Sequence, residues 1–91
     1  MAKVHFEVGG KVQGVGFRWF VREAAQRAGL AGWVKNRPDG RVEIAASGTE
    51  TAIANLVSAA RVGPPGARVD HVAELPNTGL DELPRPFTVM R

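Results

Sequence analysis

Along the chain, apolar positions recur with two different periods, and each change of period marks a new structural element. Val4, Phe6 and Val8 alternate with polar residues, which is the two-residue period of a strand with one buried face. From Phe17 onward the apolar residues recur at helical spacing. The whole pattern predicts the order strand, helix, strand, strand, helix, strand, strand. After the first strand and helix, the predicted ranges are strands over 30–37 and 41–46, a helix from Thr49 to Gly63-Pro64-Pro65-Gly66, a strand over 68–75, a loop over 77–86 and a strand over 87–89.

Both predicted helices have one apolar face and recognisable ends. Gly29 is placed to end the first helix, and the Thr49 side chain is placed to accept a hydrogen bond at the start of the second. The first apolar face comprises Phe17, Phe20, Val21, Ala24 and Ala28, and the second comprises Ile53, Leu56, Val57 and Ala60.

This element order predicts an α+β fold, the ferredoxin-like α/β sandwich with a short added C-terminal strand. Pro38-Asp39-Gly40 separates the second and third strands and is typical of a hairpin turn. The strand–helix–strand connections then place two helices on one face of a mainly antiparallel sheet, whose two central strands we expect to run parallel. The less regular fourth strand predicts a bulge. No linker or repeat divides residues 1–91, so we expect a single domain.

The amino-acid composition excludes several kinds of chemistry, although it says little about the fold. The 91 residues include no cysteine, which excludes thiol nucleophiles, disulfides and thiolate zinc sites. Twelve basic residues against nine acidic ones give a net charge of +3, which suits an anionic partner without choosing among phosphates, carboxylates and RNA. No stretch approaches the roughly 18 apolar residues of a membrane span, and no signal sequence opens the chain. We therefore expect a cytoplasmic protein with no membrane partner.

The segment from Gly10 to Arg18 is the first candidate for a functional site. Gly14 and Gly16 allow successive backbone N–H groups to converge on an anion, and the following helix N-terminus favours negative charge. The planar guanidinium of Arg18 matches phosphate oxygens. The spacing alone fits equally well a turn in which glycines only relieve strain. Two nucleotide-binding motifs fail, because Val15-Gly16 replaces the Lys-Ser/Thr of a P-loop and Trp19 replaces the third glycine of a dinucleotide fingerprint.

The second candidate segment is Gly32-Trp33-Val34-Lys35-Asn36, which leads into the hairpin. Asn36 stands near a strand end, where a side-chain amide is held rigidly, although asparagine there is more often a turn former. His5 and His71 lie far apart in the sequence and form no metal-binding pair; we expect His5 to be exposed and His71 to be structural or on the surface. Ser47 and Ser58 have no histidine near them in the sequence, so a covalent serine mechanism is not expected.

Both segments resemble the acylphosphatases, small enzymes that hydrolyse acyl phosphates. Val8-Gly9-Gly10-Lys11-Val12-Gln13-Gly14-Val15-Gly16-Phe17-Arg18 fits that family's phosphate loop without a gap. Gly32-Trp33-Val34-Lys35-Asn36 follows, with Gly40, Val42 and Gly48 at the family's spacings. Length and element order agree, so the resemblance spans nearly the whole chain.

The resemblance implies a role for each site residue. Arg18 is expected to bind phosphate and Asn36 to orient the attacking water. The backbone amides of Gln13, Gly14, Val15, Gly16, Phe17 and Arg18 are expected to cradle the phosphate. No general acid is expected, because the carboxylate of an acyl phosphate is a good leaving group. No metal, cofactor or covalent intermediate is expected either. The expected partners are small acyl phosphates and inorganic phosphate as product and inhibitor, bound by a monomer. The sequence shows no residue that reads the acyl part.

Two other functions share this layout. An RNA-binding module of the RRM type has the same strand and helix order and stacks bases on aromatic residues of its central strands. The third strand here, Arg41 to Ala46, offers no aromatic side chain, and Phe6 on the first strand is better explained as core. The other alternative is a non-catalytic phosphate-binding domain, like the acylphosphatase-like module inside hydrogenase-maturation proteins.

Overall fold

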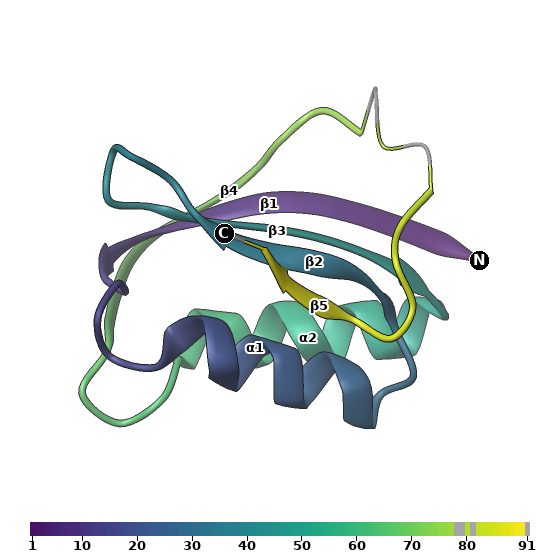
Figure 1. Ribbon diagram of the computed structural model, residues 1–91, viewed down its shortest axis with the longest axis horizontal. Coiled ribbons are helices and arrows are strands. Elements are labelled where there is room, and N and C mark those ends of the chain that lie inside the picture. Colours follow the sequence, from purple (N-terminus) through teal and green to yellow (C-terminus); the bar gives the residue numbers. More distant parts are fainter. Residues whose placement is uncertain (78–79, 81, 91) are drawn as a thin grey trace.

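A computed structural model describes residues 1–77, 80 and 82–90, and it has the predicted order of strands and helices (Figure 1). The hairpin turn and the Thr49 cap are both present: the Arg37 N–H donates to the Arg41 carbonyl, and Thr49 accepts from the Ala52 N–H. The elements are β1 (Ala2–Lys11), α1 (Phe17–Arg27), β2 (Ala31–Asn36), β3 (Val42–Gly48), α2 (Glu50–Val62), β4 (Arg68–Glu74) and β5 (Thr88–Met90).

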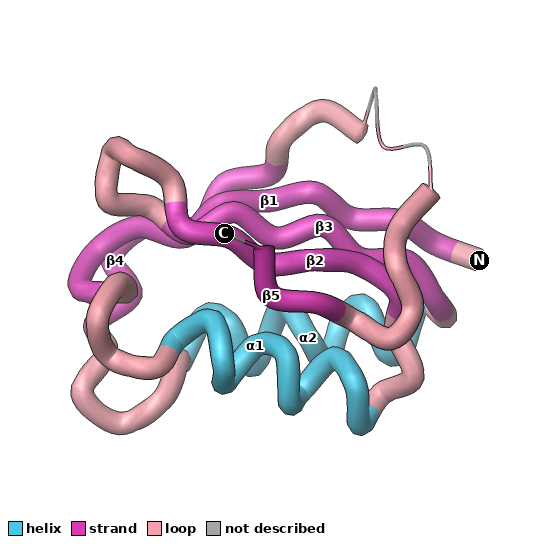
Figure 2. Tube along the Cα trace, viewed as in Figure 1, coloured by secondary structure: helices cyan, strands magenta, loops and turns pink. Residues whose placement is uncertain are grey.

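The strands form one sheet with the order β4-β1-β3-β2-β5, and both helices lie against the same face of it (Figure 2). The expectation of parallel central strands is wrong, because the neighbours β1 and β3 pair antiparallel. The hairpin makes β3 antiparallel to β2, and β3 then inserts between β2 and β1. Consequently β1 and β2 run in the same direction without touching, and the parallel pair in the sheet is β2 with β5.

The core lies between the sheet and the two helices. Phe6 and Val8 of β1 face it together with Val34, Val42 and Ile44, as the alternating pattern predicts. On α1 the expected face is rotated slightly: Ala25 is fully buried, whereas Ala28 is exposed and lies beyond the last helical residue. On α2, Leu56 and Ala60 are buried, while Ile53 and Val57 pack at the edge of the core.

The C-terminal half departs from the prediction only at its boundaries. The predicted bulge is present, because the pairing of β1 with β4 shifts register between Gly9 and Gly10. The last strand begins at Thr88, and Phe87 is instead buried in the core. The described residues of the predicted 77–86 loop lie outside helices and strands, and residues 78, 79 and 81 of that loop lie outside the described part.

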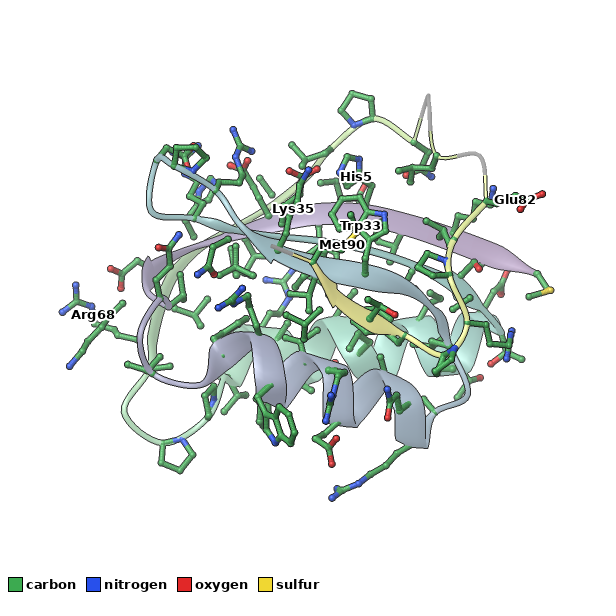
Figure 3. The ribbon with its side chains drawn as sticks, viewed as in Figure 1. His5, Trp33, Lys35, Arg68, Glu82 and Met90 are labelled. Atoms are coloured by element: carbon green, nitrogen blue, oxygen red, sulfur yellow. The ribbon has the colours of Figure 1, made fainter. Side chains whose placement is uncertain are left out.

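The helix-free face of the sheet is covered by its own charged side chains, so the expectation that His5 is exposed is wrong. The His5 ring is only 14% exposed, because it packs edge-on against Trp33 and bonds the Glu43 carboxylate (Figure 3). Glu7 and Glu43 are direct partners across β1 and β3, where like charges repel. Each has its own basic groups: Lys35 and His5 lie beside Glu43, and Arg37, Arg41 and His71 lie beside Glu7.

Candidate active site

The topology brings the two candidate segments to the same end of the sandwich. Because β1 and β2 run in the same direction, the end of β2 lies on the side where β1 leads into the glycine loop and α1 begins. Val34 points into the core, so Asn36, two residues later, projects from the same helix-covered face. Arg18 is the second residue of α1. The fold therefore sets Arg18 and Asn36 opposite each other across a gap between helix and sheet.

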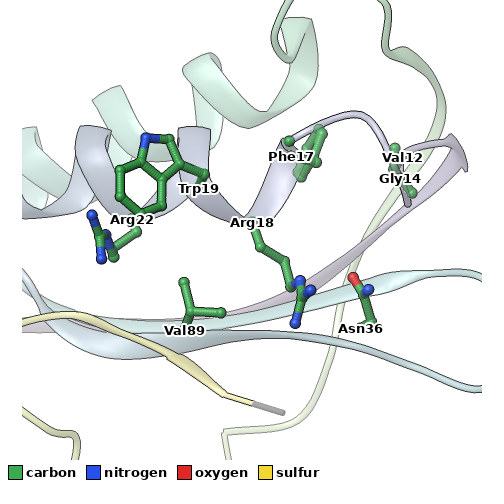
Figure 4. A pocket seen from close by; sticks show the side chains of 9 residues that line it. Val12, Gly14, Phe17, Arg18, Trp19, Arg22, Asn36 and Val89 are labelled. Carbon is green, nitrogen blue, oxygen red and sulfur yellow. The ribbon is translucent and has the colours of Figure 1, made fainter.

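A pocket of about 360 Å³ occupies this gap (Figure 4). Arg18 and Asn36 both line it, and their side chains lie next to each other in this view. Its lining residues are Val12, Gly14, Gly16, Phe17, Arg18, Trp19, Arg22, Asn36 and Val89. Among the described residues, the lining contains two arginines and no acidic side chain, so the pocket has the electrostatic character of an anion site.

The glycine loop meets the pocket with backbone rather than with side chains. Gly14 and Gly16 have φ angles of 76° and 78°, a left-handed conformation that other L-residues adopt only with strain. A Cβ atom at either position would meet nothing within 4 Å, so the space beside both residues is open. Gly16 is also the N-cap of α1 and offers no side-chain cap. The first N–H groups of α1 are thus left available to an anion.

Within the predicted 13–18 cradle, Gln13 and Val15 lie beside the pocket rather than lining it. Val15 packs against the core. The Gln13 side chain instead donates from one nitrogen to the carbonyls of Arg37 and Arg41, at 2.9 and 3.0 Å. This contact ties the glycine loop to the hairpin that follows Asn36.

Arg18 and Asn36 each keep hydrogen-bonding capacity free. Within the described chain, the Arg18 guanidinium donates to the Met90 carbonyl, at the long distance of 3.4 Å. The Oδ1 atom of Asn36 is buried and accepts no hydrogen bond from any described residue. A buried amide oxygen without a donor is costly, and a water molecule or ligand in the pocket would satisfy it.

Behind Asn36, a charged cluster holds the hairpin on the sheet. Glu7 bonds Arg37 at 2.7 Å, Arg41 at 3.0 Å and His71 at 2.9 Å, although its carboxylate is only 8% exposed. The hydrogen bond from His71 is the main cause that lowers the pKa of Glu7, and the charges of Arg41 and Arg37 lower it further, while burial opposes them. Glu7 is therefore held as a carboxylate that anchors both ends of the hairpin.

Sequence reasoning missed the far side of the pocket. Trp19, Arg22 and Val89 line it, and none of the three was singled out as a site residue. The signal was present for Arg22, which lies four residues after Arg18 and therefore on the same side of α1. Val89 carried no such signal, since its place depends on β5 pairing with β2.

Among the described residues no group of three His, Asp or Glu side chains is arranged to hold a metal ion. His5 and His71 bond different carboxylates, those of Glu43 and Glu7. Within the same part of the chain, no helix is both long and apolar enough to cross a membrane.

A ferredoxin-like sandwich with an arginine and a glycine loop at one pocket defines the chain as a small α+β protein with a basic pocket. The Acylphosphatase family model matches residues 4–88. An acylphosphatase from Bacillus subtilis is 46% identical over 89% of this chain and 89% of its own length. One from Koribacter versatilis is 57% identical over 71% of this chain and 59% of its own. The crystal structure of acylphosphatase from Bacillus subtilis matches with a TM-score of 0.90 and 43% identity, covering 100% of both chains.

The chain therefore belongs to the acylphosphatase family. Its activity is the hydrolysis of acyl phosphates, the reaction that the resemblance of its two segments predicts. The crystal structure of HypF from T. kodakarensis also matches, with a TM-score of 0.77 and 36% identity. That match covers 100% of this chain but only 12% of the HypF chain.

Proposed function

We propose that this chain hydrolyses acyl phosphates with Arg18 as the phosphate-binding group and Asn36 as the group that orients water. The observation that supports this assignment is the shared pocket: a guanidinium from α1 and an unpaired amide oxygen from β2 line the same cavity, beside a helix N-terminus without a side-chain cap. Residues 1–91 act in this proposal as one domain, a cytoplasmic monomer that releases inorganic phosphate and is inhibited by it.

The phosphoryl group binds between Arg18 and the amides of residues 13–18. Phosphoryl transfer passes through a loose transition state with charge spread over three equatorial oxygens, so positioning and charge stabilisation supply most of the catalysis. The planar guanidinium can bond two of those oxygens at once, and the loop amides can bond the third. These donors are fixed before substrate arrives, which makes each of them more effective than a donor in water.

Asn36 holds the attacking water in line with the bond to be broken. Its Oδ1 accepts a hydrogen bond from the water, and the water oxygen attacks phosphorus as the bond to the acyl oxygen breaks. The products are a carboxylate and inorganic phosphate, and the carboxylate leaves without needing a general acid. The water proton passes to the phosphate itself, since none of the described residues that line the pocket offers a side-chain base. No covalent intermediate forms.

The two roles are separated by variants assayed with acetyl phosphate. Arg18→Ala should lower kcat/KM by about 10² to 10³-fold and weaken inhibition by phosphate, because it removes the main oxyanion donor. Arg18→Lys should recover little, since an ammonium cannot bond two oxygens in a plane. Asn36→Ala should lower kcat strongly and leave phosphate inhibition nearly intact.

Arg27→Ala is the matched control, because Arg27 is an exposed arginine in the last turn of the same helix. It should keep wild-type turnover. If Asn36→Ala weakened phosphate binding at unchanged kcat, the two roles would have to be exchanged. If Arg18→Ala retained wild-type turnover, the assignment would be wrong.

A further inference from the structure

We infer that Trp19, Arg22 and Val89 form an acyl subsite next to Arg18, and that this subsite favours acyl phosphates whose acyl chain carries a second anionic group. The inference rests on the proposed function, because it takes the phosphoryl group to lie at Arg18. It adds a substrate preference that the phosphate-binding groups cannot supply, since every acyl phosphate presents the same headgroup to them.

The position of Arg22 along α1 sets the length of the acyl chain. Arg18 and Arg22 are four residues apart, so they lie about one turn, or about 6 Å, apart along the helix axis. Both line the pocket, and Figure 4 shows Val89 between their two side chains. A span of about 6 Å corresponds to roughly four to five covalent bonds of an extended chain. A four-carbon acyl chain with a terminal carboxylate has this length.

The Arg22 guanidinium is held in place, but not all of its hydrogen-bond donors have an acceptor. Its guanidinium lies over the Trp19 ring at 3.7 Å from the ring centroid, which fixes the cation against an aromatic face. One terminal nitrogen contacts Glu23 at 3.2 Å, and the Nε atom is buried with no hydrogen-bond partner among the described residues. The Arg22 side chain is 28% exposed, so a ligand carboxylate or phosphate oxygen can bond its terminal nitrogens from the pocket.

The chemistry of the other lining residues fits an acyl chain between two anionic ends. Val89 offers an apolar side chain to the methylene groups, and the 60% exposed Trp19 adds an aromatic edge at the mouth. Glu23 is the acidic residue in contact with Arg22, and it is 40% exposed, so water screens its charge. The second anion therefore meets a net positive environment inside the pocket.

The test compares two substrates of equal chain length. Succinyl phosphate ends in a carboxylate, and butyryl phosphate ends in a methyl group. The wild type should show a higher kcat/KM for succinyl phosphate. In Arg22→Gln the ratio of the two kcat/KM values should fall about 5- to 10-fold, the expected loss of one charge-assisted hydrogen bond in a partly exposed site. Arg22→Lys should retain part of the preference, because it keeps the charge.

Arg27→Gln is the matched control for net charge. It removes one positive charge from the same helix outside the pocket lining, and the ratio should stay at the wild-type value. If Arg22→Gln changed the ratio no more than Arg27→Gln did, the subsite would be refuted while hydrolysis of acyl phosphates stood. If the wild type hydrolysed none of acetyl, butyryl and succinyl phosphate, the proposed function itself would fail, and the subsite with it.

Discussion

At the scale of single residues, Gln13 shows how the proposed site depends on a side chain outside the pocket lining. Its amide nitrogen bonds the carbonyls of Arg37 and Arg41, on both sides of the hairpin turn. Asn36 directly precedes Arg37, so this contact fixes the loop proposed to bind the phosphate relative to the amide proposed to orient the water. Small displacements at this level matter, because a shift of about 1 Å between reacting groups can cost about 10²-fold in rate.

Gln13→Leu should therefore reduce stability by about 1–2 kcal/mol, through the loss of two hydrogen bonds to backbone carbonyls, and should also lower kcat several-fold. Urea unfolding and acetyl phosphate turnover measure the two effects. Gln26→Leu is the matched control, because Gln26 makes one comparable amide bond to the Phe87 carbonyl at the other end of α1. Equal kcat values for the two variants would show that Gln13 is merely structural.

The same residue marks a limit of prediction from sequence. Arg18 and Asn36 could be named because their segments resemble known motifs, and the structure brings both to one pocket. The side-chain contacts of Gln13 span 24 and 28 residues, and His5 reaches Glu43 across 38. An alternating pattern tells which face of a strand a residue occupies, but not which distant side chain covers that face. For this reason the burial of His5 was missed.

At the scale of elements, the two helices begin in opposite ways. At α2, the Thr49 hydroxyl accepts from the Ala52 N–H at 3.1 Å and satisfies one of the free helix donors. At α1, Gly16 in a left-handed conformation provides no such acceptor. The start of α2 thus contributes to stability, whereas the start of α1 leaves its backbone N–H groups available to the pocket.

Thr49→Ala should lower the free energy of unfolding by about 1 kcal/mol, the usual loss for an N-cap, and leave turnover at the wild-type level. Urea unfolding followed by circular dichroism measures the first quantity, and acetyl phosphate hydrolysis measures the second. A drop in kcat would mean that α2 contributes to the site, contrary to the geometry.

Gly16→Ala should lower both stability and turnover. The methyl group has open space, so the stability loss of about 1–2 kcal/mol comes from the left-handed backbone conformation rather than from a clash. Turnover should fall because relief of the strain moves the amides that face the pocket. Comparing Gly16→Ala with Thr49→Ala separates the two helix starts: only the former should raise the inhibition constant for phosphate.

Elements were predicted more reliably than their pairing. The hairpin turn, the Thr49 cap and the bulge were all readable from local residues and are present. The direction of neighbouring strands was not, because it depends on β3 inserting between β1 and β2. That insertion involves contacts across the whole chain, which no local period encodes.

At the scale of the whole molecule, the helix-free face balances two carboxylates at the centre of the sheet. Glu7 and Glu43 face each other across β1 and β3. Five basic side chains surround them and offset their repulsion: His5 from β1, Lys35 from β2, Arg37 and Arg41 from the hairpin, and His71 from β4. Stability should therefore depend on the ionisation of Glu7.

The pKa of Glu7 is lower in the folded chain than in the unfolded chain, so the folded state binds fewer protons between the two values. Its contribution is fully present above the ordinary glutamate pKa of about 4.3 and is lost as the pH falls through the lowered value. The difference in unfolding free energy between wild type and Glu7→Gln should thus be largest near neutral pH and shrink in acid. Urea unfolding at a series of pH values measures it, and parallel stability curves for the two proteins would contradict the prediction.

Strand β5 has a practical consequence for handling the protein. It borders β2 at the sheet edge, gives Val89 to the pocket wall and offers the Met90 carbonyl to Arg18. An affinity tag or fluorescent fusion attached after β5 would thus lie next to this pocket, and we expect it to disturb turnover without unfolding the protein. The start of β1 lies a strand's length of about 30 Å from the glycine loop, so an N-terminal label is the safer choice for kinetic work.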